Sequence, residues 1–192
     1  MSASFDQSAA AITGWGHALP RAKVASEQLE QIHRLKAGSL VAATGVKTRY
    51  IADRLGAETQ VALGLRAARV ALERADCSAS SLDLIIAASA VPQQLIPSTA
   101  PLYQQGLGLP DGGCQVLDVN TTCLSALSAL EIAASYLESG RARRVLIVSS
   151  ELASCALPWH AAPEVAGLFG DGAGAWVVEM VPGRGLVGTA FE

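Results

Sequence analysis

The sequence predicts an α/β protein whose helices cover a mainly parallel β-sheet. Three short apolar segments, at residues 84–88, 114–119 and 145–149, have the length of strands that are buried on both faces of a sheet. Helical segments separate them, a short one around 101–106 and a long one at 123–139. Strands and helices that alternate in this way are typical of a layered α/β fold.

Length and composition are sufficient for one sizeable hydrophobic core. The chain has 192 residues, of which 51% are hydrophobic, and this content excludes an intrinsically disordered protein. Its 14 Lys and Arg against 17 Asp and Glu give a net charge of −3. No basic excess is therefore present to bind nucleic acid or an anionic membrane surface.

Neither a membrane span nor a secretory signal is expected. The longest stretch without charge, 84–110, is interrupted by four prolines, which a spanning helix would not tolerate. Residues 1–11 carry Asp6 and no basic region ahead of an apolar one, unlike a signal peptide. We therefore expect a cytoplasmic protein.

The four cysteines form neither a zinc-binding nor a disulfide pattern. They contain no CxxC pair, and no histidine lies at ligand spacing. We therefore expect no metal site. Cys77, Cys114 and Cys155 are interpreted as packing residues, because free cysteines are commonly buried.

The N-terminal part is expected to hold a short strand at 11–16 and two helices. Ser26 can cap the first helix, in which apolar residues recur on one face. These residues are Leu29, Ile32 and Leu35. The second helix, 58–75, has apolar residues at helical spacing and arginines available for the opposite face.

The segment 123–139 is predicted to be a buried helix. It follows a strand, it carries only two charged residues, and Gly140 closes it. A helix that is apolar nearly all round is expected to be covered on every side.

A glycine-rich segment, Phe-Gly-Asp-Gly-Ala-Gly-Ala, leads into two expected strands at 176–180 and 185–189, which a Pro-Gly turn joins. Asp171 in this segment is expected to fix a turn rather than to transfer protons. Gly172 and Gly174 are expected to permit close backbone approach. No GK[ST] follows them, so a phosphate cradle is disfavoured.

Cys123 lies where a predicted strand hands over to a helix. A cysteine in the first turn of a helix feels the positive end of the dipole, which favours the thiolate and helps to hold an oxyanion. The alternative is a small, buried and inert cysteine. The junction makes Cys123 the candidate nucleophile.

Three segments resemble the β-ketoacyl synthase III group of the thiolase superfamily. Residues 118–127 (DVNTTCLSAL) resemble its nucleophile segment, 169–175 (FGDGAGA) its glycine-rich strand entry, and 44–50 (TGVKTRY) a third family segment. They follow the family's order and approximate spacing. The resemblance implies a thiolase-like layered α/β fold of two similar halves. Residues 1–192 would be the N-terminal half-domain, with the C-terminal half absent from this chain.

The same resemblance implies an acyltransferase that condenses acyl thioesters in fatty acid or polyketide biosynthesis. Cys123 would be acylated from acyl-coenzyme A or acyl-acyl carrier protein, and the acyl group would condense with a second thioester such as malonyl-acyl carrier protein. The second half, or a second subunit, would supply a histidine and an asparagine. These thioesters would be substrates, no cofactor is implied, and the family pattern implies a homodimer.

Two further positions are expected to touch substrate. Lys47 keeps a basic residue where the family usually has one, for a phosphate group or as a solvated charge. Ile96 stands where the family places a residue that crosses the dimer interface and closes the partner's acyl pocket. It would either leave room for a group longer than acetyl or pack at the dimer contact. Ser39 and Ala43 replace a Trp and an Arg that often hold the adenine, so coenzyme A is held differently or is not the donor.

Other interpretations stay open. His17, His33 and His160 are read as surface or structural residues, although His160 follows Trp159 in a loop that the family places near the mouth of the substrate channel. The chain could instead be a non-catalytic auxiliary half-subunit that pairs with a condensing enzyme. It could also be an acyltransferase that uses the same cysteine without condensation.

Overall fold

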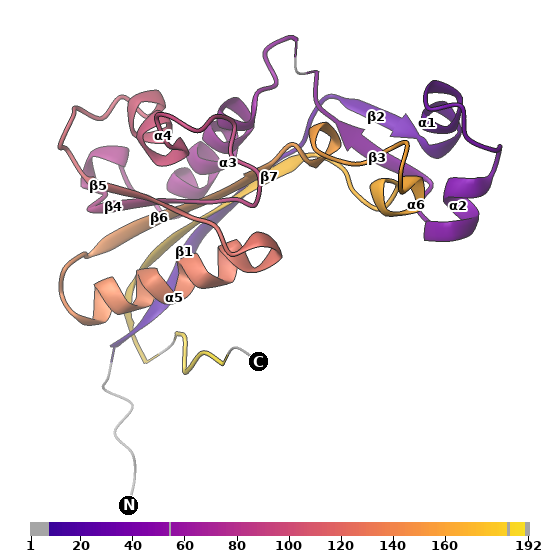
Figure 1. The fold of residues 1–192 in the computed structure, drawn as a ribbon. Helices are drawn as coiled ribbons and strands as arrows, with labels where there is room; N and C mark the ends of the chain where they lie inside the picture. The colour runs from indigo at the N-terminus through magenta and orange to yellow at the C-terminus, as the bar shows by residue number, and fades with distance from the viewer. Residues whose placement is uncertain (1–7, 54, 184, 191–192) are drawn as a thin grey trace, which may run out of the picture.

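A five-stranded mixed β-sheet forms the centre of the computed structural model, which describes residues 8–53, 55–183 and 185–190. Its strand order is β1-β7-β6-β4-β5 (Figure 1). The strands are β1 (Ser8–Ala18), β4 (Leu84–Ala88), β5 (Gln115–Val119), β6 (Arg144–Glu151) and β7 (Gly172–Pro182). Strands β5, β4 and β6 run parallel, as predicted, whereas β7 is antiparallel to both β6 and β1.

Helices cover both faces of this sheet. α3 (Gln60–Arg74) and α4 (Thr99–Gly106) lie on one face, and α5 (Ser125–Glu138) lies on the other (Figure 1). Each lies within or close to a segment that was predicted to be helical, so the predicted α/β layering is confirmed. Among the described residues, we find no helix whose length and apolarity would let it cross a membrane.

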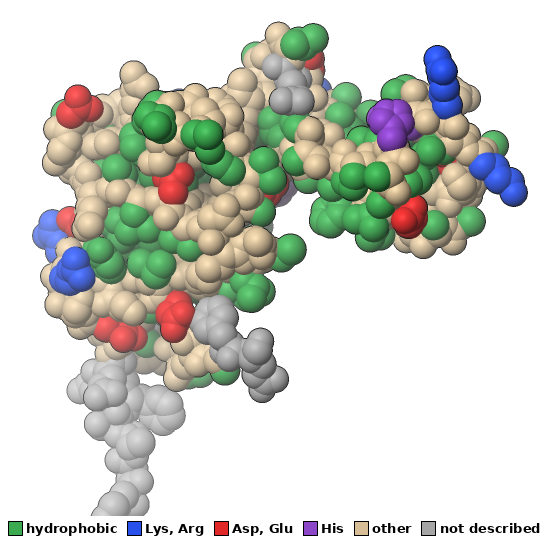
Figure 2. Space-filling view, in the orientation of Figure 1, with side chains coloured by type: hydrophobic (Ala, Val, Ile, Leu, Met, Phe, Trp, Pro, Cys, Tyr) green, Lys and Arg blue, Asp and Glu red, His purple; other side chains and the backbone are tan. Residues whose placement is uncertain are grey.

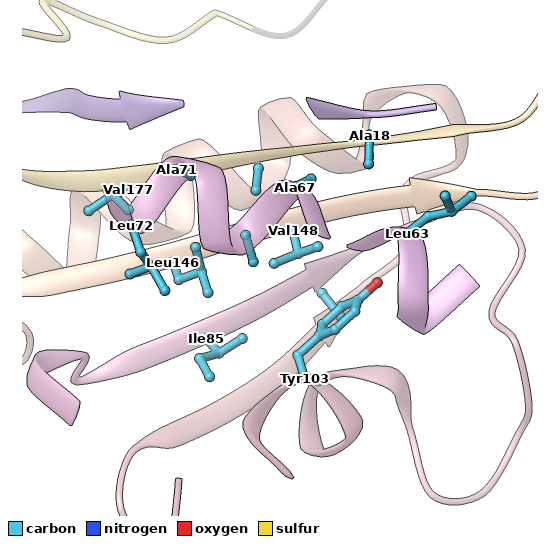
Figure 3. Packing of buried hydrophobic residues seen from close by; sticks show 14 of the residues in the cluster. Ala18, Leu63, Ala67, Ala71, Leu72, Ile85, Tyr103, Leu146, Val148 and Val177 are labelled. Carbon is cyan, nitrogen blue, oxygen red and sulfur yellow. The ribbon is translucent and has the colours of Figure 1, made fainter. Parts of the chain in front are cut away.

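The face covered by α3 holds the larger apolar core. Leu63, Leu146 and Val177 are fully buried in it (Figure 3). α3 approaches the sheet closely, because a Cβ placed on Gly14 or Gly16 of β1 would lie 2.2 Å from a backbone oxygen of α3. The helical period predicted α3. The close packing of α3 on Gly14 and Gly16 was not predicted.

The opposite face buries one side of α5 only. Ala129, Ala133 and Leu137 pack on the sheet, whereas Leu127 points away and is 51% exposed. The prediction of a helix covered on every side is therefore wrong for the described residues. Gly140, with a left-handed φ of 70°, follows the end of the helix as predicted.

A small lobe projects from one end of the sheet (Figure 1, Figure 2). It pairs β2 (Ala22–Ala25) with β3 (Thr48–Ile51) and adds α1 (Ser26–Ile32), α2 (Ser39–Thr44) and α6 (Pro163–Ala166). Its core consists of Leu29, Leu40, Trp159 and Ala166. The sequence predicted only α1, because the other elements are too short to show a clear period.

Three local predictions are wrong. Ser26 does not cap α1, because Ala25 holds the N-cap position and the Ser26 hydroxyl instead donates to the Val46 carbonyl at 2.5 Å. Ile32 is 67% exposed and does not share the buried face of Leu29. Residues 185–189, all described, form no strand, although the Leu186 N–H donates to the Ala10 carbonyl at 2.7 Å.

Candidate active site

Cys123 lies in a short 3₁₀ turn, Thr122–Leu124, between β5 and α5. It therefore precedes α5 instead of standing in the first turn of that helix, which corrects the predicted position by one turn. Its side chain is exposed, so the alternative of a buried cysteine is wrong for the described residues. A reagent or substrate can reach the thiol.

The turn that carries Cys123 is strained and then held by hydrogen bonds. Thr122 has a φ of 52°, an uncommon conformation for a β-branched residue that costs roughly 1–3 kcal/mol. Its N–H donates to Asn120 Oδ1 at 3.0 Å, and its carbonyl accepts from Ser125 Oγ at 2.7 Å. A strained conformation persists only where surrounding contacts fix it. Here the hydrogen bonds with Asn120 and Ser125 fix it.

Cys123 opens onto a hollow of about 400 Å³ between the sheet and the small lobe. Hydrophobic side chains gather at the end of α5 and on the side of the lobe that faces it (Figure 2). The lining residues come from both parts of the molecule: Ala90, Val91, Thr122, Cys123, Ser125, Ala126, Ser149, Glu151, Ala153, Ala156, Leu157, Phe169 and Gly170. A mainly apolar hollow with one exposed thiol suits an acyl chain that is held next to a nucleophile.

Glu151, at the end of β6, is the carboxylate of this hollow. It accepts hydrogen bonds from the N–H groups of Ala90 and Val91. Burial raises the pKa of Glu151, and the two N–H donors lower it in part. Neither Glu151 nor Asn120 was predicted as a site residue from the sequence. A signal was available, because Glu151 ends β6 and Asn120 directly follows β5, the two strands that flank β4. Polar residues at the carboxyl ends of parallel strands often line a site.

Asp171 has a structural role, as predicted. Its hydrogen bonds reach two segments distant in the chain instead of one local turn. Its buried carboxylate accepts from the Ala52 N–H at 2.8 Å, the Ser154 N–H at 2.9 Å and the Ser154 hydroxyl at 2.7 Å. It therefore connects the segment after β3 with the 3₁₀ turn Ala153–Cys155 beside the hollow.

Among the glycines of this segment, Gly170 has the closest neighbour, although no close approach was predicted there. A Cβ there would lie 3.0 Å from the Tyr50 carbonyl oxygen. The expected approach at Gly172 is looser, at 3.3 Å from a Leu19 methyl group, and Gly174 has no neighbour closer than 4.0 Å. The prediction for Gly174 is therefore wrong, because the chain comes close to the lobe before it enters β7.

The two predicted substrate-binding residues lie outside the hollow. Lys47 is exposed in the small lobe, just before β3, and Ile96 is 89% exposed in the segment between β4 and α4. Neither lines the cavity that Cys123 faces. Their contacts with substrate stay predictions.

The described histidines also lie away from Cys123. His33 stacks on Trp159, with ring centroids 4.4 Å apart, and meets His160 edge-on at 6.0 Å. Burial lowers the pKa of His33, and the neighbouring His160 lowers it further. His17 lies in β1, and none of the three lines the hollow.

Two of the other cysteines are packing residues, as predicted. Cys77 and Cys114 pack against the core under α3, and burial raises the pKa of both thiols. Cys155 instead borders a second hollow of about 260 Å³ together with Gln60 and Val91. Over residues 8–53, 55–183 and 185–190, no group of three or more His, Cys, Asp or Glu could hold a metal ion.

Comparisons of sequence identify proteins to which the chain is similar. The family described as 3-oxoacyl-[acyl-carrier-protein (ACP)] synthase III matches residues 117–192. The chain is 41% identical over 174 residues to the β-ketoacyl-[acyl-carrier-protein] synthase III of Erythrobacter litoralis, covering 91% of this chain and 53% of that protein. It is 36% identical over 176 residues to the Allorhizobium ampelinum protein of the same name, covering 92% and 53%.

Solved structures show the same fold. The 3-oxoacyl-[acyl-carrier-protein] synthase III of Aquifex aeolicus has a TM-score of 0.79 and 37% identity, over 88% of this chain and 53% of that one. OleA of Xanthomonas campestris has a TM-score of 0.78 and 25% identity, over 90% and 56%. The chain spans about half the length of the curated relatives it matches.

The fold, with the thiol of Cys123 between β5 and α5, is that of the thiolase superfamily, so the predicted fold class is confirmed. Within that superfamily, the chain is similar to 3-oxoacyl-[acyl-carrier-protein] synthase III proteins, and the match covers the N-terminal part of those relatives.

Proposed function

We propose that this chain is the nucleophile-bearing part of an acyl-thioester condensing enzyme. The observation that carries the proposal is the exposed Cys123, held in a strained turn at the mouth of an apolar hollow. The Cys123 thiolate would attack the thioester carbonyl of acyl-coenzyme A or acyl-acyl carrier protein, forming a new thioester and releasing the donor's thiolate.

The acyl group would then condense with a second thioester such as malonyl-acyl carrier protein, with loss of carbon dioxide, to give a β-ketoacyl product. A histidine and an asparagine for this step would come from a second half or a second subunit. This part of the proposal is supported by the absence of histidine from the described lining of the hollow and by relatives about twice as long.

The proposed setting is fatty acid or polyketide biosynthesis in the cytoplasm, with acyl carrier protein as a partner and the chain in a homodimer. Lys47 would meet the donor's phosphate groups, and Ile96 would reach the acyl pocket of the second copy. The exposure of Ile96 supports a contact outside its own chain.

The test is intact-mass spectrometry after incubation with acyl-coenzyme A donors of increasing chain length. We expect the chain to gain one acyl mass that Cys123→Ala abolishes and the matched control Cys155→Ala retains. Addition that survives Cys123→Ala would contradict the assigned nucleophile. No addition with any donor, to the chain alone or with its second half supplied, would favour the auxiliary role.

A further inference from the structure

The dipeptide that follows β4 is held by side chains. Glu151 accepts from the Ala90 N–H and, at 3.4 Å, from the Val91 N–H. Asn120 Nδ2 donates to the Ala90 carbonyl at 3.0 Å, and Gln60 Nε2 donates to the Val91 carbonyl at 2.9 Å. All four backbone polar groups of Ala90 and Val91 therefore have a side-chain partner.

One of these partners also holds the nucleophile turn. While Asn120 Nδ2 donates to Ala90, its Oδ1 accepts from the Thr122 N–H at 3.0 Å. The side-chain amide of Asn120 therefore bridges the Ala90 peptide and the residue before Cys123. A continuous path of hydrogen bonds leads from Glu151 through Ala90 and Asn120 to Thr122.

The held dipeptide is also part of the wall beside the thiol. Ala90 and Val91 line the hollow that Cys123 faces, and Val91 also borders the smaller hollow beside Cys155. Glu151 reaches this dipeptide from β6 and Asn120 reaches it from the end of β5. Both strands pair with β4, so the backbone of the sheet fixes the distance between the two side chains.

We propose that Asn120 and Glu151 are positioning residues that hold the Ala90–Val91 wall and the Cys123 turn in a fixed position relative to each other. They would thereby limit the size of the group that Cys123 accepts. The consequence for acyl selection rests on the proposed function. The mechanical part rests on the hydrogen bonds alone. Glu151 supplies two acceptor oxygens that face two N–H donors, and charge-assisted bonds of this kind are the strong ones.

The experiment measures alkylation of Cys123 by iodoacetamide and by N-alkyl iodoacetamides of increasing chain length, read by intact mass. The proteins are the unmodified chain, Glu151→Gln, Asn120→Ala and the double variant. Cys123→Ala gives the background from the other thiols. Glu138→Gln, which changes an exposed carboxylate at the far end of α5, is the matched control.

We expect each single variant to raise the ratio of the long-reagent rate to the short-reagent rate by roughly tenfold. Each variant weakens or removes one or two of the hydrogen bonds that hold Ala90 and Val91. The double variant should show no further tenfold rise, because both residues act through Ala90. Glu138→Gln should keep the original ratio. Asn120 is exposed, so Asn120→Ala tests the inference even if Glu151→Gln fails to fold.

A ratio unchanged within about twofold in folded Asn120→Ala would overturn the inference, and so would two strictly additive effects. Alkylation needs no acyl transfer, which separates this test from that of the proposed function. A chain that shows the ratio change but takes no acyl group from any donor, even with its second half supplied, would contradict the function and retain the positioning role. Acyl transfer without the ratio change would retain the proposed function and contradict the positioning role.

Discussion

The two faces of the central sheet differ in how completely they are covered. Under α3 the packing is closed: Leu63 is fully buried, and Gly14 and Gly16 bring the backbone of β1 against that of the helix. Around α5 the packing is one-sided, and Leu124 and Leu127 are about half exposed at the end that carries Cys123. Packing stability therefore concentrates on the α3 face, whereas the α5 face leaves Cys123 exposed.

Small residues explain why α3 can come so close. Gly64, Ala67 and Ala71 face inward, and Gly64 leaves room for the ring of Tyr103, whose hydroxyl oxygen would lie 2.5 Å from an added Cβ. Close packing of this kind leaves little space for relaxation.

The largest expected difference is between two leucines on opposite faces. Leu63→Ala should lower the free energy of unfolding by about 2–5 kcal/mol, because it opens a cavity in a closed core. Leu127→Ala should change it by less than about 0.5 kcal/mol, because the side chain is half exposed. Urea unfolding of both variants measures the difference, and equal losses would remove the contrast between the faces.

A methyl group added to a glycine of β1 tests how closely α3 packs on the sheet. Gly16→Ala should cost about 3 kcal/mol, at the upper end for overpacking, because the new Cβ would meet a backbone oxygen of α3 that cannot move alone. Gly188→Ala is the matched control, since nothing lies within 4 Å of its Cβ position. Similar unfolding midpoints for the two variants would show that α3 is packed less closely than described.

Buried hydrogen bonds, instead of apolar packing, organise the surroundings of the hollow on the α5 side. Asp171→Asn replaces an acceptor oxygen with an NH₂ group among three donors, so we expect a loss of about 1–3 kcal/mol. Hydrogen exchange should also quicken at the Ala52 and Ser154 amides. Unchanged exchange at both amides would mean that Asp171 does not hold this segment.

The smallest expected effect is an alkaline loss of stability on the α3 face. Burial raises the pKa of the Cys77 and Cys114 thiols above the ordinary value of 9.0. Above that pH the unfolded chain loses protons that the folded chain retains, so stability falls as pH rises. Unfolding in reductant at pH 8 and pH 10 measures the loss. Substituting both cysteines by alanine should make it smaller, and an unchanged loss would assign it to other groups.

The sequence was informative wherever a period or a long apolar run existed. Residues 84–88 were read as a buried strand, and they are β4 with every residue buried. The spacing of Val61, Leu65, Ala68 and Leu72 predicted α3 within two residues at its start and one at its end. The small lobe was largely missed, because strands of four residues and helices of four to six carry no measurable period.

The sequence by itself determined the layered α/β class, the resemblance to the synthase III group and the place of Cys123 at a strand-to-helix junction, because these depend on residues that lie close together in the chain. Only the tertiary structure decided which side of α5 is covered. It alone brought Glu151 to Ala90 across 61 positions and joined both to the turn that carries Cys123 through Asn120. Hydrogen bonds between distant segments depend on strand order and register, and a single sequence states neither.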